Sequence, residues 1–221
     1  MILETATQRS DDWYAARCGK ATASRFKDVL ARKKPTAEQA KKKLPGDPTA
    51  DRQKYLTELV VERLTGQPAP AYENAAMRWG TEQEAAARAA YEQRTEVAVE
   101  ETGFVAHDVL MAGCSPDGLA DWDGLIEIKC PYNSAMHIET LLNGMPAEHT
   151  AQVQGQMWIT GRQWCDFVSY DPRMPVPLQL HVQRINRDPA FIADLERQVT
   201  EFLNEVGAQV EALRRLAESR K

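Results

Sequence analysis

Two carboxylates and an amine lie close together near the middle of the sequence. Asp117 is followed ten residues later by Glu127, and Lys129 comes two residues after that. Asp-Gly at 123–124 between apolar runs predicts a β-hairpin turn. Side chains alternate across a strand, so Glu127 and Lys129 should project from the same face. The turn would fold the first strand back and bring Asp117 near the Lys129 end of the second strand.

This grouping suits a divalent metal. Two carboxylates beside an ammonium group repel each other unless a cation joins them, and Mg²⁺ typically takes one or two carboxylates and keeps several waters. A bound metal polarises a phosphoryl oxygen and lowers the pKa of a water, and a second one ~3.5–4 Å away can stabilise the leaving oxygen. A charged Lys129 would orient the attacking water or stabilise transition-state charge. The alternative is a solvated strand face, but apolar Ile126 and Ile128 on the opposite face favour a site for phosphodiester hydrolysis.

A second group of residues could bind phosphate. Arg17 ends the first predicted helix, and a second helix is expected to begin near Thr22 and Ser24. Free backbone amides at a helix N-terminus attract anions. An arginine guanidinium can bind a phosphate through two hydrogen bonds, and a serine hydroxyl can donate one more. A surface ion pair is the alternative for Arg17. Trp13 could stack on a base, separate strands near a DNA end, or be buried in the core.

Composition limits the classes of protein. The chain has 221 residues and 24.8 kDa, with 43% hydrophobic and 27% charged residues. We expect one domain over residues 1–221, because a domain typically needs roughly 100–200 residues. The formal net charge of −5 argues mildly against nucleic-acid binding. A bound divalent ion would invert the sign of an acidic site.

Cysteine spacing and hydropathy point to the cytoplasm. Cys18, Cys114, Cys130 and Cys165 form no C-x-x-C pair, so a zinc ribbon or an iron–sulfur clamp is not expected. No apolar run approaches the ~20 residues that span a bilayer, and the first thirty residues lack a secretory core. We expect a reduced cytoplasmic protein with no membrane contact.

Periodicity and caps predict the order of the elements. A helix should follow Ser10 and end before Gly19, and a basic excursion near 32–48 should form a mobile loop or contact a nucleic-acid backbone. Strands are expected from residue 96 onward. The further predicted elements are helices at 50–65, 74–94 and about 146–160, strands at 167–170 and 178–185, and an amphipathic C-terminal helix at 189–218 that packs on the core or on another subunit. The fold class is α/β, with a mixed, mostly antiparallel central sheet flanked by helices.

The motifs resemble a known nuclease group. Residues 115–119 and 127–131 resemble the active-site signature of the PD-(D/E)xK nuclease superfamily, and more narrowly the phage lambda exonuclease group, the YqaJ-type viral recombinases. The likeness covers most of the chain and is weakest at 32–48. It extends to Gln8-Arg9, Trp13, Arg17, Gly19, 22–24, Trp79-Gly80, Glu84, 151–154, 157–158 and 170–174. The resemblance implies a restriction-endonuclease-like core.

The resemblance also implies roles for individual residues. Asp117 and Glu127 would ligate the metal together with the backbone carbonyl of Ile128, and Lys129 would be the catalytic lysine. Glu84 matches a glutamate on a helix that lines the family's site, and its spacing from Trp79-Gly80 favours it over Glu82.

A helical glutamine is matched as well. Gln152 corresponds to a catalytic-site glutamine of the family. His149, Gln152 and Gln156 would form one polar stripe on a helix. For His149 and Gln156 the residues leave site and surface equally open.

The implied function is a magnesium-dependent 5′-to-3′ exonuclease of the alkaline or lambda type. By resemblance, Arg17 with Thr22 and Ser24 would hold the terminal 5′-phosphate of linear duplex DNA. The enzyme would use two Mg²⁺ ions, for which Mn²⁺ can substitute, and release mononucleotides. It would form a phage-type homotrimeric ring and leave a 3′ strand for a single-strand annealing protein and recombination.

Two alternatives stay open at this point. One is a nuclease of the same superfamily with another polarity or with endonuclease activity. The other is a non-catalytic protein that binds DNA ends, which the complete set of Asp117, Glu127 and Lys129 disfavours.

Overall fold

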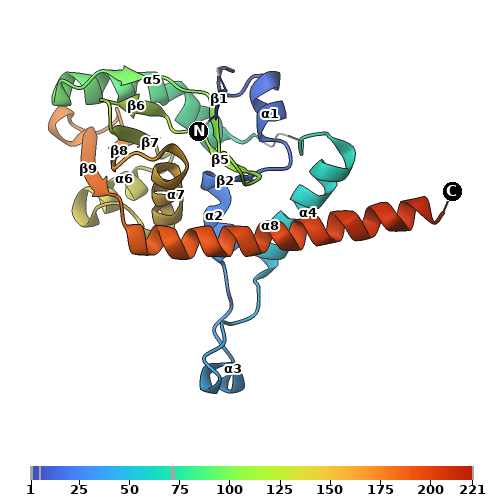
Figure 1. The fold of residues 1–221 in the computed structure, drawn as a ribbon. Coiled ribbons are helices and arrows are strands. Elements are labelled where there is room, and N and C mark those ends of the chain that lie inside the picture. Colours follow the sequence, from blue (N-terminus) through green and yellow to red (C-terminus); the bar gives the residue numbers. More distant parts are fainter. Residues whose placement is uncertain (1, 5, 71–72, 221) are drawn as a thin grey trace.

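The computed structural model describes residues 2–4, 6–70 and 73–220, and these residues form a mixed α/β fold (Figure 1). The strands are β1 (Ile2–Glu4), β2 (Ala21–Thr22), β3 (Val99–Glu100), β4 (Phe104–Ala106), β5 (Ala112–Cys114), β6 (Gly118–Ala120), β7 (Gly124–Lys129), β8 (Trp164–Tyr170) and β9 (Leu180–Asn186). The helices are α1 (Asp11–Arg17), α2 (Phe26–Leu30), α3 (Ala37–Lys41), α4 (Ala50–Thr65), α5 (Ala75–Thr95), α6 (Ser134–Asn143), α7 (Thr150–Thr160) and α8 (Pro189–Glu218). Three 3₁₀ turns, η1 (Ala23–Arg25), η2 (Ala147–His149) and η3 (Val176–Leu178), complete the described elements.

The larger sheet has the strand order β3-β6-β7-β8-β9. Its pairs are antiparallel except β7 with β8, which run parallel with Glu127 opposite Phe167. A parallel pair needs a long crossover connection, and α6 and α7 lie in this one. A smaller sheet has the order β1-β4-β5-β2, with one parallel pair, β2 and β5. The expected α/β class with a mostly antiparallel central sheet is confirmed.

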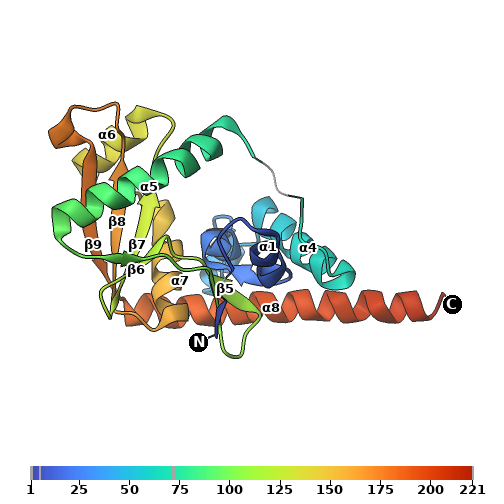
Figure 2. The same cartoon turned by 90° about the horizontal axis from the view of Figure 1, so that it is seen from above.

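Helices cover both faces of the larger sheet. α5 packs against β7, β8 and β9, where Tyr91 joins a core with Ile126 and Val168 (Figure 2). α7 packs on the other face, where Met157 joins Leu125 in a second core. The alternation of β7 therefore sends Ile126 toward α5 and Leu125 toward α7, as period-two patterning requires.

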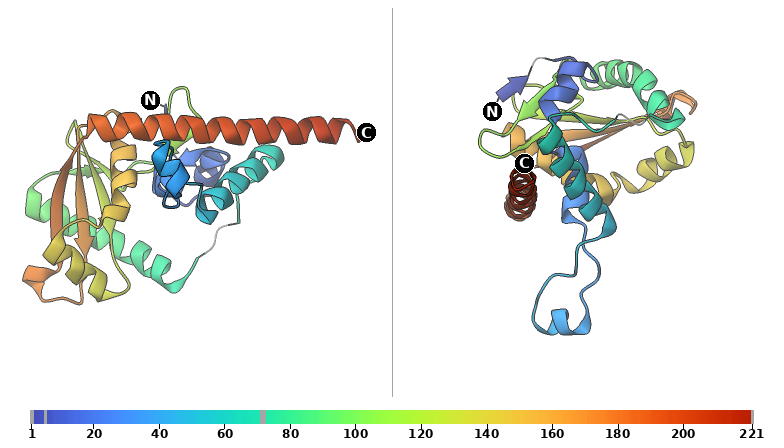
Figure 3. Two further views of the ribbon diagram at one scale, coloured as in Figure 1. Left: turned by 90° about the horizontal axis from the view of Figure 1, so that it is seen from below. Right: turned by 90° about the vertical axis from the view of Figure 1, so that its right-hand side faces the viewer.

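The C-terminal helix is an amphipathic brace. Asp188 caps α8 by accepting hydrogen bonds from the first backbone amides, and Pro189 occupies its first turn. Its buried stripe packs against α4 and the core, as predicted. Figure 3 shows α8 running along one side of the molecule, with its C-terminal end projecting past α4. Leu213 lies near this end and is 43% exposed.

The basic excursion stands away from the rest of the chain, with α3 at its tip (Figure 1). Its two arms pair through an isolated bridge between Arg32 and Pro48. A Cβ on Gly46 would lie 1.8 Å from the Lys33 carbonyl oxygen, so the arms approach closely only because this residue is glycine. A capping box between Thr36 and Gln39 starts α3. The predicted mobility of the excursion stays a prediction.

Several predicted boundaries need correction. Thr22 belongs to a strand rather than a helix, because residues 21 and 22 pair with the distant strand β5. The segment at 146–160 begins as a 3₁₀ turn, residue 178 lies in η3 rather than in a strand, and α6 was not predicted at all. The four cysteines are free. Among the helices within the described ranges, none combines the length and the apolar character that crossing a bilayer requires.

Candidate active site

The predicted hairpin forms and brings its acidic residues together. Gly118 pairs with Ile126 across β6 and β7. Asp117 lies just before β6, where its backbone amide donates to the Ile126 carbonyl (3.2 Å) and its Oδ2 accepts from the Ile128 amide (2.6 Å). The carboxyl group of Asp117 is thereby tied to the strand that carries Glu127. The juxtaposition expected from the sequence is confirmed.

Three donors surround the Glu127 carboxylate. Lys129 Nζ and Gln152 Nε2 both donate to Oε1, at 2.5 and 2.6 Å. Gln156 Nε2 donates to Oε2 at 2.5 Å. The Glu127 side chain is only 2% exposed, and Lys129 shares its face of β7. The polar stripe of α7 therefore points at β7 through both of its glutamines.

Electrostatics make the pair of carboxylates unfavourable when nothing is bound. Burial, followed by the negative charge of Glu127, raises the pKa of Asp117 well above its usual range. Burial disfavours the Lys129 ammonium, but the two carboxylates outweigh it and raise the pKa of that group. Lys129 therefore stays charged at neutral pH.

The donor set fits a hard divalent ion. Asp117 Oδ1 accepts no hydrogen bond within the described ranges. Burial and the charge of Glu127 raise the pKa of this carboxyl, so a cation beside it would stabilise the ionised form. The same ranges hold no group of three or more His, Cys, Asp or Glu side chains that could share an ion. Mg²⁺ does not require one, because it binds through one or two carboxylates and keeps several waters. The carboxylates of Asp117 and Glu127 thus fit such an ion, and the part of the Ile128 carbonyl stays a prediction from the family resemblance.

Glu84 lies near this group but has other partners. Its carboxylate pairs with Arg9 (2.8 Å) and Arg88 (3.5 Å). Its charge also contributes to the raised pKa of Asp117, which places it within electrostatic range of the hairpin. Arg9 holds a left-handed backbone conformation (φ 70°), a strained state for a non-glycine residue that is typical of functional sites.

The predicted phosphate pocket is a cavity of about 630 Å³ lined by Trp13, Arg17, Thr22 and Ser24, among others. The Arg17 guanidinium stacks 4.0 Å from the centre of the Trp13 ring. Trp13 Nε1 donates to Ser115 Oγ (2.9 Å), and Arg17 also contacts that oxygen (3.4 Å). Trp13 is thus half-buried with one face of its ring against Arg17.

Arg17 has the properties of an anion-binding residue. No carboxylate in the described part of the chain forms an ion pair with it, which excludes the alternative of a surface ion pair there. Burial lowers the pKa of its guanidinium because the charge is poorly solvated. The hydroxyl groups of Thr22 and Ser24 lie 3.3 Å apart in the same cavity. An incoming phosphate would supply the missing negative charge.

The two groups of residues are joined through Ser24. A second cavity of about 250 Å³ is lined by Ser24 together with Lys27, Lys129, His149 and Gln152, among others. Burial and then the Lys129 charge lower the pKa of His149 to about 4, so its ring is neutral at pH 7. The cavity that contains Arg17 and the one that contains Lys129 therefore share a wall at Ser24.

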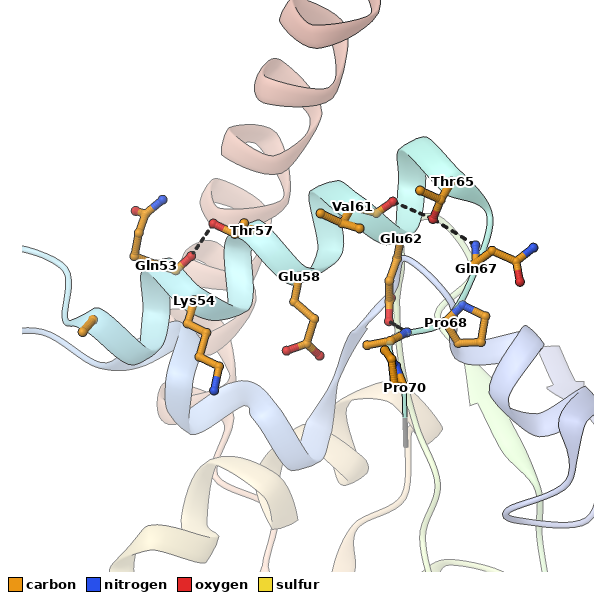
Figure 4. Close-up of a pocket in the computed structure, with 12 residues that line it drawn as sticks. Gln53, Lys54, Thr57, Glu58, Val61, Glu62, Thr65, Gln67, Pro68 and Pro70 are labelled. Atoms are coloured by element: carbon orange, nitrogen blue, oxygen red, sulfur yellow. Dashed lines mark hydrogen bonds between the residues drawn. The ribbon is translucent and has the colours of Figure 1, made fainter. Parts of the chain in front are cut away.

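A larger cavity of about 870 Å³ adjoins the Arg17 pocket along α4, and the two share Glu58, Glu62 and residues 68–70 (Figure 4). Its two acidic residues already have partners. Glu58 accepts from Arg25, and Glu62 accepts from the amides of Gly19 and Ala69. No group suited to phosphodiester chemistry converges there in the described ranges.

Sequence reasoning missed some contacts. Ser115 belongs to the recognised motif, yet its role in joining Trp13 and Arg17 to the hairpin had no signal in the sequence. Gln8 donates to the Pro116 carbonyl (2.8 Å) and thus supports the residue before Asp117. The sequence did not decide whether Gln156 belongs to the site or to the surface, and in the structure its side chain donates a hydrogen bond to Glu127.

Comparisons with known proteins point to one family. A family model described as YqaJ-like viral recombinase domain matches residues 12–163. The crystal structure of an alkaline exonuclease (LHK-Exo) from Laribacter hongkongensis is 45% identical, with a TM-score of 0.84, and the match covers 96% of this chain and 100% of that chain. LHK-Exo in complex with dAMP matches over the same shares at 45% identity and a TM-score of 0.85.

A more distant structure supports the fold alone. A phage related exonuclease from Haemophilus somnus 129PT is 16% identical, with a TM-score of 0.69, and the match covers 88% of this chain and 96% of that one. No curated protein matches the chain.

Proposed function

We propose, since this chain belongs to the YqaJ-like viral recombinase domain family, that it is a DNA exonuclease that digests the 5′-ended strand of linear duplex DNA with Mg²⁺. The observation that carries the proposal is the convergence of Asp117, Glu127 and Lys129 beside a cavity that shares Ser24 with the Arg17 pocket. The 45% identity to an alkaline exonuclease over 96% of the chain supports a DNA exonuclease.

Each residue of the hairpin has a task in strand cleavage. Asp117, Glu127 and the Ile128 carbonyl would hold Mg²⁺, which polarises a phosphoryl oxygen and lowers the pKa of a water when bound. The charged Lys129 stabilises negative charge that develops on the phosphate. Gln152 donates to Glu127 and lies 3.5 Å from Lys129 Nζ through its amide oxygen, so that it orients both groups.

The Arg17 pocket would give the enzyme its direction. A terminal 5′-phosphate held by Arg17 and Ser24 lies at a fixed separation from Lys129, so the bond that is cut is set by distance from the end. Each cut creates a new 5′-phosphate that can move into the same pocket. Mononucleotides are the expected product, and dAMP is the ligand in one of the LHK-Exo structures.

The family resemblance suggests an assembly and a partner. We propose a homotrimeric ring around the duplex, which lets a modest basic lining act on DNA although the chain carries a net charge of −5. The 3′ strand that remains would pass to a single-strand annealing protein during recombination. Sedimentation of the full chain tests the ring, because a trimer has three times the mass of 24.8 kDa.

The decisive experiment uses a linear duplex labelled on one strand at one end. With Mg²⁺ we expect mononucleotides from the 5′-ended strand and an intact 3′-ended strand. Glu127→Gln should abolish digestion, whereas Glu82→Gln should not, because Glu82 is exposed and lies two residues from Glu84. Digestion from the 3′ end would refute the polarity, and cutting of a supercoiled circle would indicate an endonuclease. End binding without digestion in Mg²⁺ or Mn²⁺ would indicate a non-catalytic protein.

A further inference from the structure

We infer that Gln156 is a positioning residue that fixes the Glu127 carboxylate for metal binding, an inference that rests on the proposed function. Gln156 Nε2 donates to Glu127 Oε2 at 2.5 Å. The other two donors, Lys129 and Gln152, both contact Oε1. Among the described residues, Gln156 is thus the one that donates a hydrogen bond to Glu127 Oε2. Its side chain is only 1% exposed.

The arrangement controls rotation of the carboxylate. The last torsion of a glutamate side chain is broad and has no strong preference of its own. Donors on Oε1 alone leave the second oxygen free to swing about that contact. A third donor on Oε2 fixes the plane of the group, and hydrogen bonds of this kind to metal-ligating carboxylates strongly affect metal affinity.

The unpaired end of Gln156 argues that the amide does not serve the fold. Its Oε1 is buried and has no hydrogen-bond partner among the residues that the structure describes. A buried acceptor without a partner is less favourable than an apolar side chain of the same size, such as the neighbouring buried Met157. Burial alone would therefore favour methionine or leucine here, and the contact of Nε2 with Glu127 explains the glutamine.

Helix geometry brings Gln156 to this position. Gln152 and Gln156 are four residues apart on α7, so they lie on the same face of the helix. That face packs against β7 at Glu127.

Gln154 on the same helix provides a matched control. It is also buried, at 4% exposure, but both ends of its amide have partners. Nε2 donates to the Asn186 carbonyl (2.9 Å), and Oε1 accepts from the Asp188 amide (2.9 Å). These contacts hold the start of α8, away from Glu127. Gln154 therefore serves the fold, whereas Gln156 serves the carboxylate.

The experiment compares Gln156→Met and Gln154→Met in the full chain. Calorimetric titration with Mn²⁺ alone, without DNA, measures metal affinity, and thermal unfolding in EDTA measures stability. We expect Gln156→Met to bind Mn²⁺ about tenfold more weakly, with an unchanged or higher Tm, and to regain exonuclease rate as Mg²⁺ is raised. Gln154→Met should have a lower Tm than the wild-type protein and the same affinity for Mn²⁺.

Other outcomes would overturn the inference. Unchanged Mn²⁺ affinity in Gln156→Met, or equal weakening in both variants, would show that Gln156 does not act through Glu127. Failure of both Gln156→Met and Gln156→Leu to fold would show that the amide serves the fold. A Glu127→Gln titration separates the two proposals. Binding of Mn²⁺ that survives Glu127→Gln refutes the proposed metal site, whereas binding that is lost there but kept in Gln156→Met refutes the role of Gln156 alone.

Discussion

Replacing Arg17 by methionine tests the link between the phosphate pocket and the direction of digestion. The Arg17 guanidinium stacks on Trp13 and contacts Ser115, but it pairs with no carboxylate in the described ranges. Methionine keeps most of the apolar stem and removes the charge. The perturbation is therefore the loss of one half-buried cation that faces a cavity of about 630 Å³.

The expected magnitude follows from the strength of a hydrogen bond to a charged group, about 1.5–3 kcal/mol net. This corresponds to a fall of about 10- to 150-fold in kcat/KM on duplexes that carry a 5′-phosphate. Duplexes with a 5′-hydroxyl offer Arg17 no anion, so the variant and the wild-type protein should digest them at similar rates. The preference for phosphorylated ends should thus fall by the same factor.

The assay measures initial rates of nucleotide release from the two duplexes, for the wild-type protein, Arg17→Met and Arg25→Met. Arg25 lines the same cavity, but it is paired with Asp28 (2.5 Å) and Glu58 (3.3 Å). Its removal should leave the preference for phosphorylated ends unchanged. An equal loss on both duplexes in Arg17→Met would refute the reasoning, because Arg17 would then support the fold or duplex binding in general.

Three further perturbations have expected results. Burial and the neighbouring carboxylate raise the pKa of Asp117 in the folded chain, so this carboxyl opposes folding at any pH above the ordinary pKa of an aspartate. Asp117→Asn should therefore raise the Tm at pH 7 in EDTA while abolishing digestion with Mg²⁺, and a lower Tm would contradict this. Burial and the adjacent lysine lower the pKa of His149 from 6.5 to about 4, so the unfolded chain takes up the proton first and the free energy of unfolding should fall between pH 6.5 and 4; urea titrations should show a smaller fall in His149→Gln. Glu205→Ala leaves the buried guanidinium of Arg52 without its carboxylate and should lower the free energy of unfolding by about 1–3 kcal/mol, less than for a fully buried pair because Glu205 is half exposed, whereas Glu211→Ala, in an exposed pair, should change it little.

The acidic hairpin could be predicted from sequence because its geometry is local. Strand alternation alone puts Glu127 and Lys129 on one face, and the turn at 123–124 needs only a few residues to return the chain. The position of Asp117 then follows from hairpin pairing. The metal that these residues would bind stays a prediction from their chemistry.

Helix boundaries were predictable for the same reason. Predicted limits of 50–65 and 189–218 match Ala50–Thr65 and Pro189–Glu218. Their caps, Thr49 and Asp188 at the starts and Gly66 after the first of them, act within a few residues.

Contacts between distant segments depended on the tertiary structure. Residues 21 and 22 form a strand only because β5, about ninety residues later in the chain, lies beside them. No local sequence pattern predicts this pairing. Ser115 meets Trp13 across a similar separation. The sequence places Gln156 on a polar stripe of a helix. Such a stripe can either be exposed to water or form hydrogen bonds with a buried carboxylate, and the sequence does not distinguish the two. The packing of α7 against β7 determines the outcome, because it buries Gln156 away from water and places Glu127 within hydrogen-bond distance.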